Sequence, residues 1–510
     1  MNIRIWLARA AGALMIALLS SCMTVGPDYH VPANAVVQSP MIKGPLQGSD
    51  DPAISLAPLP DDWWQLYDDP KLNGLVQEAL RANTDLRVAA ANLRRSLANF
   101  QEVQAEHLVQ GNITAGTSRE QYSGEAFLTK QQPPVINVGS YGVSVSYLID
   151  IFGKLERADE ASLAAAQASQ AALDSARVMV VSQTVLAYVQ GCAATHELEV
   201  AQRQLALQES AVTLTRKLVD AGRNQPADVP QARSPAESLR ASLPRFRAEQ
   251  AAAAYRLSVM LGQPPGAPSL PQAECREEPW LKQPLPVGDG AALLKRRPDV
   301  RQAERELASS TAKIGVATAD LYPSISLGAT GGVAGALSDL GMGDTRHWSF
   351  GSLVTWNFPT NGAQARVRRA EAGADASLAH FDGVVLKALE EAQSALARYT
   401  NELSRNGALR EARDQASVVA HEQRRLYQGG RVPYLLSLDA DRTLANAEAT
   451  LAESDAQIAY YQVSVFQSLG GGWQQDHSPL SRADCGFADA SVSPQTRSVT
   501  GRRSTAGPRL

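Results

Sequence analysis

The spacing of hydrophobic positions changes along this chain from helical to alternating and back, and the whole series occurs twice. Apolar residues recur at helical spacing from about 71 to 110, and alternation with Gly and Ser follows at 140–150. The same alternation returns at 348–358, ahead of a second long alanine-rich stretch. A period near 3.6 predicts helices and a period of two predicts strands. The pattern therefore predicts two copies of one arrangement of helices and strands.

The two copies align closely in the sequence. Tyr141 corresponds to Phe350 and Gly153 to Gly362 without a gap, and the Gly-Arg pair at 222–223 matches the pair at 430–431 after a small slip. A repeat of roughly 200 residues is far too long for the unit of a solenoid. We interpret it as a duplicated half-structure with internal pseudo-symmetry.

Four strands are predicted, at about 111–119, 140–150, 323–333 and 348–358. Each has about ten residues, the length that a tilted strand needs to cross a bilayer. A soluble four-stranded sheet with one wet face is the alternative at this stage. Aromatic residues lie toward the strand ends, as in the girdles of membrane barrels: Tyr141, Tyr147, Trp348, Phe350, Trp356 and Phe358.

Four strands cannot close a barrel alone, because single-chain membrane barrels begin at about eight strands. An open sheet edge is not tolerated in lipid. If the strands cross a membrane, several copies of the chain must share one barrel. Three copies would give twelve strands, but the sequence does not fix the number of copies.

Two very long helices are predicted, at about 155–219 and 364–428, and each is followed by a returning helix, at 228–262 and 434–469. At 1.5 Å per residue, about 65 residues extend roughly 98 Å, which fits no compact globule. A free-standing coiled coil is disfavoured, because each long helix turns back at a tip to form an antiparallel hairpin. The predicted fold is mainly α with a transmembrane β part.

The first residues have the features of an export signal. A positively charged start precedes an apolar run at 10–19 that is too short to span a membrane. The run ends in Leu-Ser-Ser before Cys22, which resembles the bacterial lipoprotein cleavage box, after which Cys22 would carry lipid. Met23 in place of Asp then implies sorting to the outer membrane. An ordinary secretory signal with an incidental cysteine is the alternative.

The remaining composition excludes several classes of function. The net charge of −4 is not clustered, which argues against a nucleic-acid partner. We find no catalytic constellation, no spacing of metal ligands and no phosphate loop, so the sequence predicts neither an enzyme nor a cofactor. No stretch after residue 25 has the run of about 20 apolar residues that a spanning helix needs. Cys192, Cys275 and Cys485 are odd in number and widely spaced, and we interpret them as incidental.

The chain divides into six predicted segments. Four prolines, Pro226, Pro230, Pro235 and Pro244, occur in the first returning hairpin, and those inside its helix are expected to disturb it. The segments are a signal peptide at 1–21, a lipid-anchored tether at 22–62, a first repeat at 63–262, a Pro-rich connector at 263–288, a second repeat at 289–473 and a disordered tail without assigned role at 474–510.

From Cys22 to about Trp473, the chain resembles the outer membrane factor family of TolC- and OprM-type efflux ducts, including the NodT-like lipoproteins. Each matching motif is weak alone, while their order and spacing are specific. They are Cys22 with Val25-Gly26-Pro27-Asp28-Tyr29 and Pro32, Trp63-Trp64 before Leu72, Asp150-Ile151-Phe152-Gly153-Lys154, Arg297-Pro298-Asp299-Val300, Ala319-Asp320-Leu321-Tyr322-Pro323, and Leu438-Asp439-Ala440 with Arg442.

The resemblance implies a homotrimer with a twelve-stranded barrel in the outer membrane and a twelve-helix tube in the periplasm. It implies passive conduction of small molecules such as drugs and toxic or aromatic compounds. The partners would be a periplasmic adaptor, an inner membrane pump of resistance-nodulation-division or major-facilitator type, and outer membrane lipids. No cofactor is implied beyond the covalent lipid on Cys22. A duct for type I protein secretion and a non-conducting structural lipoprotein are the alternatives.

In this family the tube closes where the helix hairpins turn. The matching gate positions are Asp228, Tyr427, Leu435, Asp439 and Arg442. Charge-assisted hydrogen bonds can hold such a constriction shut, and each exposed pair contributes only about 0–1 kcal/mol, so modest adaptor binding could open it. A simple i, i+3 surface pair of Asp439 with Arg442 is the alternative.

The adaptor is expected to contact the hairpin tips. The tip residues are Gly222, Arg223, Gly430 and Arg431. Each glycine also has a simpler interpretation, which is that it ends its helix in a left-handed conformation.

Overall fold

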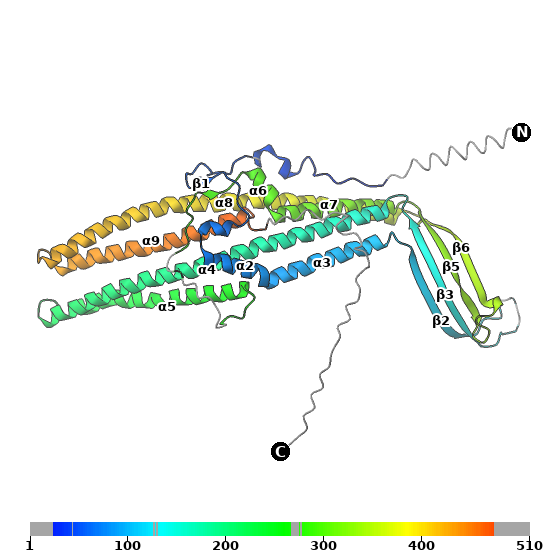
Figure 1. Cartoon of the computed structure of the whole chain (residues 1–510), viewed down its shortest axis with the longest axis horizontal. Coiled ribbons are helices and arrows are strands. Elements are labelled where there is room, and N and C mark those ends of the chain that lie inside the picture. Colours follow the sequence, from blue (N-terminus) through cyan, green and yellow to red (C-terminus); the bar gives the residue numbers. More distant parts are fainter. Residues whose placement is uncertain are drawn as a thin grey trace, which may run out of the picture.

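The computed structural model describes residues 24–473 except 43, 126–127, 129–130, 267–274 and 276–277. The predicted signal peptide, Cys22, Cys485 and the tail at 474–510 lie outside the described residues. The described chain is elongated, with helices along most of its length and a β-sheet at one end (Figure 1).

Two helices run through the helical part, and each begins where its strand pair ends. α4 (Lys154–Asp220) has 67 residues and α8 (Asn361–Gln428) has 68, which corresponds to a length of about 100 Å each. The other helices are α2 (Pro70–Ala82), α3 (Thr84–Ala105), α5 (Asp228–Met260), α6 (Gly290–Arg296), α7 (Pro298–Ala319) and α9 (Tyr434–Ser468).

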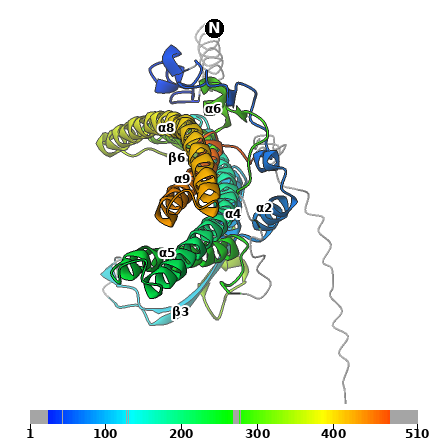
Figure 2. The ribbon, with the colours of Figure 1, turned by 90° about the vertical axis from the view of Figure 1, so that its left-hand side faces the viewer.

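Four helices lie side by side along the helical part of the chain. Toward the sheet the order is α3, α4, α7, α8, and toward the tips it is α5, α4, α9, α8. Seen from the tip end, the helices α5, α4, α9 and α8 form an arc, and α2 lies on its convex side (Figure 2). This wall of helices therefore alternates continuous helices with columns made of two helices placed end to end.

The two end-to-end joints are built in the same way. At the first, the Asn83 side chain caps α3 and donates to the carbonyl of Met260, the last residue of α5, at 3.1 Å. At the second, Arg297 precedes α7 and donates to the carbonyl of Ser468, the last residue of α9, at 2.9 Å. Both incoming helices end on a left-handed glycine, Gly262 or Gly470. Such glycines commonly end helices because they lack a Cβ.

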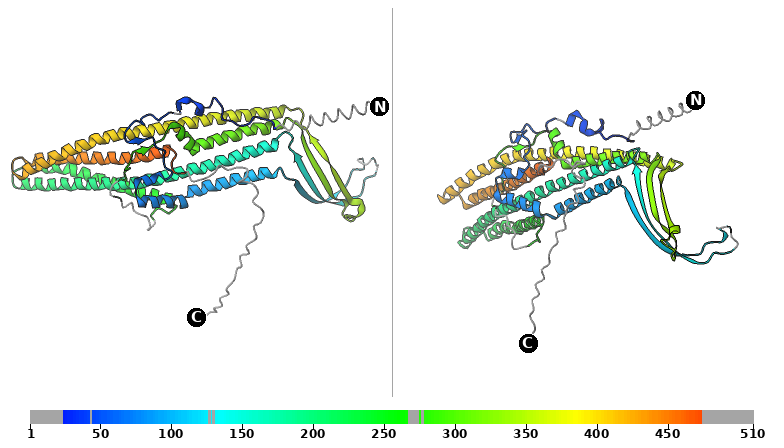
Figure 3. Two further views of the ribbon diagram at one scale, coloured as in Figure 1. Left: turned by 45° about the horizontal axis from the view of Figure 1, so that its top comes forward. Right: turned by 45° about the vertical axis from the view of Figure 1, so that its right-hand side comes forward.

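The sheet is antiparallel with strand order β2, β3, β5, β6. Its strands are β2 (Gln110–Glu120), β3 (Ile136–Ile149), β5 (Ser324–Ala336) and β6 (Arg346–Thr355). The sheet extends beyond the helices at an angle to them (Figure 3). The four segments with alternating periodicity thus form one sheet, and β3 and β5 pair across the two repeats.

The segment after residue 24 lies along the outside of the helices and contains short elements of its own (Figure 1). Its strand β1 (Ile54–Ser55) pairs in parallel with β4 (Leu285–Pro286) of the connector. The segment also contains three short 3-10 helices, η1 (Val36–Gln38), η2 (Pro40–Ile42) and η3 (Trp63–Tyr67). A further 3-10 helix, η5 (Gly343–Thr345), lies between β5 and β6.

The main hydrophobic core lies at mid-length, where helices from both repeats meet the segment before α2. Trp63 and Trp64 are buried, and the Trp63 ring stacks on Phe466 of α9 with centroids 4.4 Å apart. Since Trp63 and Phe466 belong to opposite ends of the chain, this core joins the two repeats.

The cysteine prediction was wrong. Cys192 of α4 and Cys275 of the connector form a disulfide with their Cα atoms 5.1 Å apart. The two residues are 83 positions apart in sequence, and they meet only because the connector returns to α4. Spacing along the chain cannot reveal such a contact.

Two further predictions about helices need correction. α5 continues through Pro235 and Pro244 as one helix, although prolines were expected to disturb it. α4 contains a window apolar enough to cross a membrane by length and composition, contrary to the sequence prediction. Most of that window is buried against other elements, so its apolar character belongs to the core.

We predict that Gly262→Ala lowers the thermal unfolding midpoint more than Gly222→Ala does. Both glycines have φ +68°, which costs roughly 1–2 kcal/mol for other residues. An added Cβ at Gly262 would lie 2.6 Å from the Ala82 carbonyl oxygen, whereas at Gly222 it would meet nothing within 4 Å. The overlap should add about 1–3 kcal/mol. Equal midpoints for the two variants, measured in detergent by circular dichroism, would contradict the joint geometry.

Candidate functional site

The strand register separates the sheet into an apolar and a polar face. One row across the four strands places Ile113, Val143, Gly331 and Trp348 side by side. The side chains of Ile113 and Trp348 are 79% and 83% exposed. No described element covers this face (Figure 3). An uncovered apolar face of this kind marks contact with a partner or a membrane.

The opposite face of the sheet is polar. The adjacent row consists of Asn112, Ser144, Thr330 and Ser349, and the Thr330 and Ser349 hydroxyls are 2.7 Å apart. Apolar residues on one face and polar residues on the other are typical of strands with lipid outside and water inside. A soluble sheet would instead need a cover over its apolar face, and the described elements supply none.

The two hairpin tips have matching backbone geometry. Gly222 and Gly430 both have φ +68°. Each following arginine donates its backbone N–H to a carbonyl five residues back, Arg223 to Leu218 and Arg431 to Leu426. These are Schellman-type helix ends. The glycines therefore end α4 and α8, and the two arginine side chains lie exposed at the tips.

The predicted gate residues lie near these tips but make different contacts from those considered in the sequence. Arg442 donates its Nε–H to Gln208 of α4 at 3.0 Å rather than to Asp439. Asp439 is exposed and has no ion-pair partner within the described ranges. Asp228 accepts a hydrogen bond from the Gln225 backbone at 3.1 Å, which is a local cap.

Tyr427 lies at the end of α8, and Tyr434 and Leu435 lie at the start of α9. Tyr427 packs on Tyr434 with ring centroids 5.2 Å apart, and Leu435 is 70% exposed. An exposed leucine at a hairpin end is available for contact with another chain.

A groove of about 730 Å³ separates the two hairpins beside these residues. Gln208, Tyr427 and Arg442 all line it. Sequence reasoning missed the groove's main polar contacts. These are Gln204 to the Ala445 carbonyl, Gln208 to the Ala232 carbonyl, and Arg424 to Asp441. The i, i+4 spacing of the two glutamines was visible, but nothing in it indicates partners on other helices.

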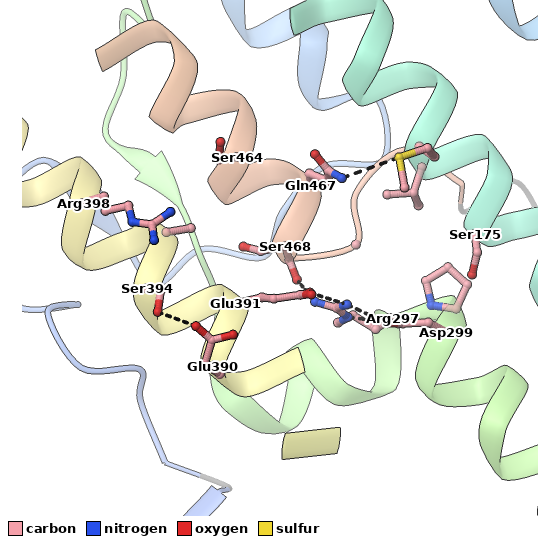
Figure 4. Close-up of a pocket in the computed structure, with 15 residues that line it drawn as sticks. Ser175, Arg297, Asp299, Glu390, Glu391, Ser394, Arg398, Ser464, Gln467 and Ser468 are labelled. Atoms are coloured by element: carbon pink, nitrogen blue, oxygen red, sulfur yellow. Dashed lines mark hydrogen bonds and ion pairs between the residues drawn. The ribbon is translucent and has the colours of Figure 1, made fainter. Parts of the chain in front are cut away.

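A second cavity, of about 510 Å³, lies at the joint between α9 and α7 (Figure 4). Arg297 fills one side and is bound by Asp299 at 2.6 Å, by Glu391 of α8 at 2.8 Å and by the Ser468 carbonyl. A guanidinium with these partners has few donors left for a ligand. We therefore assign Arg297 a structural role, which is to hold three helices together.

Several carboxylates lie close together at mid-length of the helical part, where α4, α5, α9 and the connector meet. The pKa of Glu197 is raised to about 7, mainly by burial and next by the carboxylate of Glu278. Arg245 opposes this shift, and Glu249 and Glu453 add to it. No group of three or more potential metal ligands occurs among the described residues.

The sequence matches the family described as outer membrane efflux protein over residues 75–263 and 291–471. The chain belongs to this family. It is therefore an outer membrane protein of the efflux channel class, and its family consists of channels rather than enzymes. The two matched regions cover most of the two repeats, including the strand pair and the hairpin of each.

Similarity to several named proteins supports the assignment of this chain to the efflux protein family. Nodulation protein T of Rhizobium leguminosarum bv. trifolii is 28% identical over 91% of this chain and 97% of its own. The cation efflux system protein CusC of Escherichia coli O6:H1 is 28% identical over 90% of this chain and 98% of its own. The solved outer-membrane channel OprN has a TM-score of 0.81 and 33% identity, covering 88% of this chain and 100% of that one.

We predict that acidification stabilises the efflux protein through Glu197. The folded pKa is about 7 against an ordinary value of 4.5, so this carboxyl lowers stability progressively as pH rises from about 4.5 to 7. Glu197→Gln should remove this part of the pH dependence. Unfolding midpoints between pH 5 and 8 test it, with Glu199→Gln as the control, since the Glu199 side chain is 42% exposed on the same helix and does not contribute to the shift. An unchanged pH profile in Glu197→Gln would show that Glu197 does not carry the effect.

Proposed function

We propose that three copies of this chain form the outer membrane duct of a tripartite efflux system. The duct passively conducts small molecules received from an inner membrane pump, of resistance-nodulation-division or major-facilitator type, through a periplasmic adaptor. The observation that carries the proposal is a four-stranded sheet whose apolar face is uncovered and whose two edges are unpaired among the described residues.

The open edges argue for several copies. β2 and β6 are the outer strands of the sheet, so each has one row of backbone groups without a strand partner within the described chain. In lipid, such groups must be paired, because no water is present to bind them. Pairing β6 of one copy with β2 of the next satisfies both edges and closes a ring.

The internal repeat gives the register of this pairing. Ala115 pairs with Tyr141 in the first repeat, and Ala329 pairs with Phe350 in the second, so Ala115 and Ala329 occupy equivalent positions. By the same alignment, Val145 corresponds to Val354. Because Val145 pairs with Ala329 between the repeats, Val354 should pair with Ala115 of the next copy.

The helices favour the same assembly. α4 contacts α7 and α9 within the chain, so α8 should contact α3 and α5 of the next copy in the equivalent way. Apolar side chains are exposed on these outer helices, among them Val88 of α3, Tyr255 of α5 and Val418 of α8. Three copies with four helices abreast give a twelve-helix tube that continues a twelve-stranded barrel.

We predict that Val354→Cys combined with Ala115→Cys yields disulfide-linked oligomers after mild oxidation of whole cells. The equivalent intrachain pair, Val145 and Ala329, lies directly opposite across two strands. Val354→Cys with Thr117→Cys is the off-register control, and Cys485→Ser removes the remaining unassigned cysteine from both backgrounds. Non-reducing gels give the readout. Equal cross-linking of both pairs, or none of either, contradicts the register.

The N-terminal segment supports a lipid anchor at the level of the barrel. The Val25 backbone donates to the Phe152 carbonyl at 3.1 Å, and Thr24 lies against Gly153, just past the end of β3. Cys22 is two residues upstream of Thr24, so a lipid on it would lie near the membrane surface. The tips, with Gly222-Arg223 and Gly430-Arg431, then project into the periplasm toward the adaptor.

The proposed gate is a constriction at the periplasmic end of the duct, formed by Asp228, Tyr427, Leu435, Asp439 and Arg442. Within one copy, Arg442 holds its hairpin to α4 through Gln208. Asp439 and Leu435 are exposed and thus available to neighbouring copies. A latch of such weak contacts can be opened by partner binding.

We predict that Arg442→Ala or Asp439→Ala raises ion conductance of the purified protein in planar bilayers. Each exposed polar contact is worth about 0–1 kcal/mol, which corresponds to at most about a fivefold change in the open fraction. Arg203→Ala is the control, since Arg203 is 60% exposed on α4. An equal rise in conductance of the Arg203→Ala control would contradict a specific latch at Asp439 and Arg442. No conductance from any correctly inserted form would favour the structural lipoprotein.

A further inference from the structure

Cys275 and the residues at 278–286 of the connector contact both hairpins. We call Cys275 together with residues 278–286 the strap. At one end Cys275 is bonded to Cys192 of α4. Farther along, the Trp280 ring lies 5.5 Å from the guanidinium carbon of Arg410, which belongs to α8. The strap thus reaches both long helices.

The α4 end of the strap is held at two adjacent points. His196 lies one helical turn after Cys192, so both side chains are on one face of α4. The Nδ1 atom of His196 is 3.1 Å from the carboxylate of Glu278, whose side chain is 1% exposed. The disulfide therefore fixes a segment that is already inserted into the wall.

The far end of the strap is tied to the outside of the tube. Lys282 forms an ion pair with Asp68 at 2.6 Å, just before α2. Leu285 is fully buried and pairs with Ile54 in the small parallel sheet. These contacts lie on the α2 side, which is the convex side of the arc (Figure 2).

A short chain segment fixed to two helices limits how far those helices can separate. The strap connects the α4–α5 hairpin with the α8–α9 hairpin, and the groove of about 730 Å³ lies between the same hairpins nearer the tips. At the α8 end, one cation–π contact contributes modestly. At the α4 end, the covalent bond removes most of the freedom to detach.

We propose that the Cys192–Cys275 disulfide anchors a strap that restrains separation of the two hairpins, so that reduction of this bond loosens the tips. The restraint itself does not depend on conduction. Its effect on ion flow rests on the proposed function.

In an exported protein the bond has a chemical source, since the periplasm is oxidising. The Cys275 thiolate attacks a protein disulfide of a dithiol oxidoreductase, forming a mixed disulfide. The Cys192 thiolate then attacks the Cys275 sulfur, and the oxidoreductase leaves as its dithiol. Two electrons pass to the oxidoreductase. Because Cys192 is fully buried, the second step requires the strap to be seated on α4.

Hydrogen exchange of the full-length protein in detergent tests the restraint. The samples are the oxidised protein, the same protein after reduction of the folded state, and the double variant Cys192→Ala with Cys275→Ala. We expect exchange to accelerate at least about threefold in residues 278–286 and in both hairpin tips of the reduced and variant forms. Cys485→Ala is the control and should match the oxidised protein.

A second variant separates the restraint from a general loss of stability. Trp280→Ala leaves the disulfide intact but frees the α8 end, so it should accelerate exchange at the tips to a similar extent. Faster exchange in the strap with unchanged tips overturns the proposal, as does reduction without effect on either. If the double variant does not fold, reduction of the folded protein decides.

Bilayer recordings then address conduction separately. Reduction should raise conductance of the wild-type protein and leave Cys192→Ala with Cys275→Ala unchanged. If reduction accelerates hydrogen exchange at the tips but no form of the protein conducts ions, the proposed duct function is wrong and the proposed restraint by the strap still holds.

Discussion

The structure depends on one constraint, which is that the chain exposes an apolar sheet face that it cannot cover itself. Trp348, Ile113 and Val143 lie in one row of that face. The faces alternate strictly because every strand pair is in register, so a shift by one residue would send the aromatic side chains to the polar side. In the proposed assembly, the bilayer covers the apolar face and strands of neighbouring copies pair with the open edges. The sheet thus links the proposed position in the membrane to the proposed assembly of copies.

The helical part follows from the same duplication. α4 and α8 are continuous, while α3 with α5 and α7 with α9 form columns interrupted at mid-length. The interruption lies where the hydrophobic core, the N-terminal segment and the connector all gather. Because each column is broken at that level, α5 can shift relative to α3, and α9 relative to α7, without bending a helix, whereas α4 and α8 pass through unbroken. The strap crosses the wall in this same zone.

Much of this fold could be predicted because its signals are local. Alternation over about ten residues gave the four strands, and long helical spacing gave α4 and α8. The contacts that were missed are not local. Cys192 meets Cys275 only through the path of the connector, and Arg442 meets Gln208 only through the packing of two hairpins. For the apolar window of α4, composition alone cannot distinguish a core helix from a spanning one. Sequence could place the gate residues near the tips by resemblance, but it could not name their partners.

The two end-to-end joints occupy equivalent places yet differ in chemistry. Asn83 holds one through a neutral amide, and Arg297 holds the other through a guanidinium between two carboxylates. Neutral hydrogen bonds are nearly indifferent to dissolved ions, whereas partly exposed charges are screened by them. In a closed ring of copies the two joints would alternate around the circumference. A rise in the ionic strength of the periplasm would then weaken the joint in every second column, and the joints held by neutral hydrogen bonds would keep their strength.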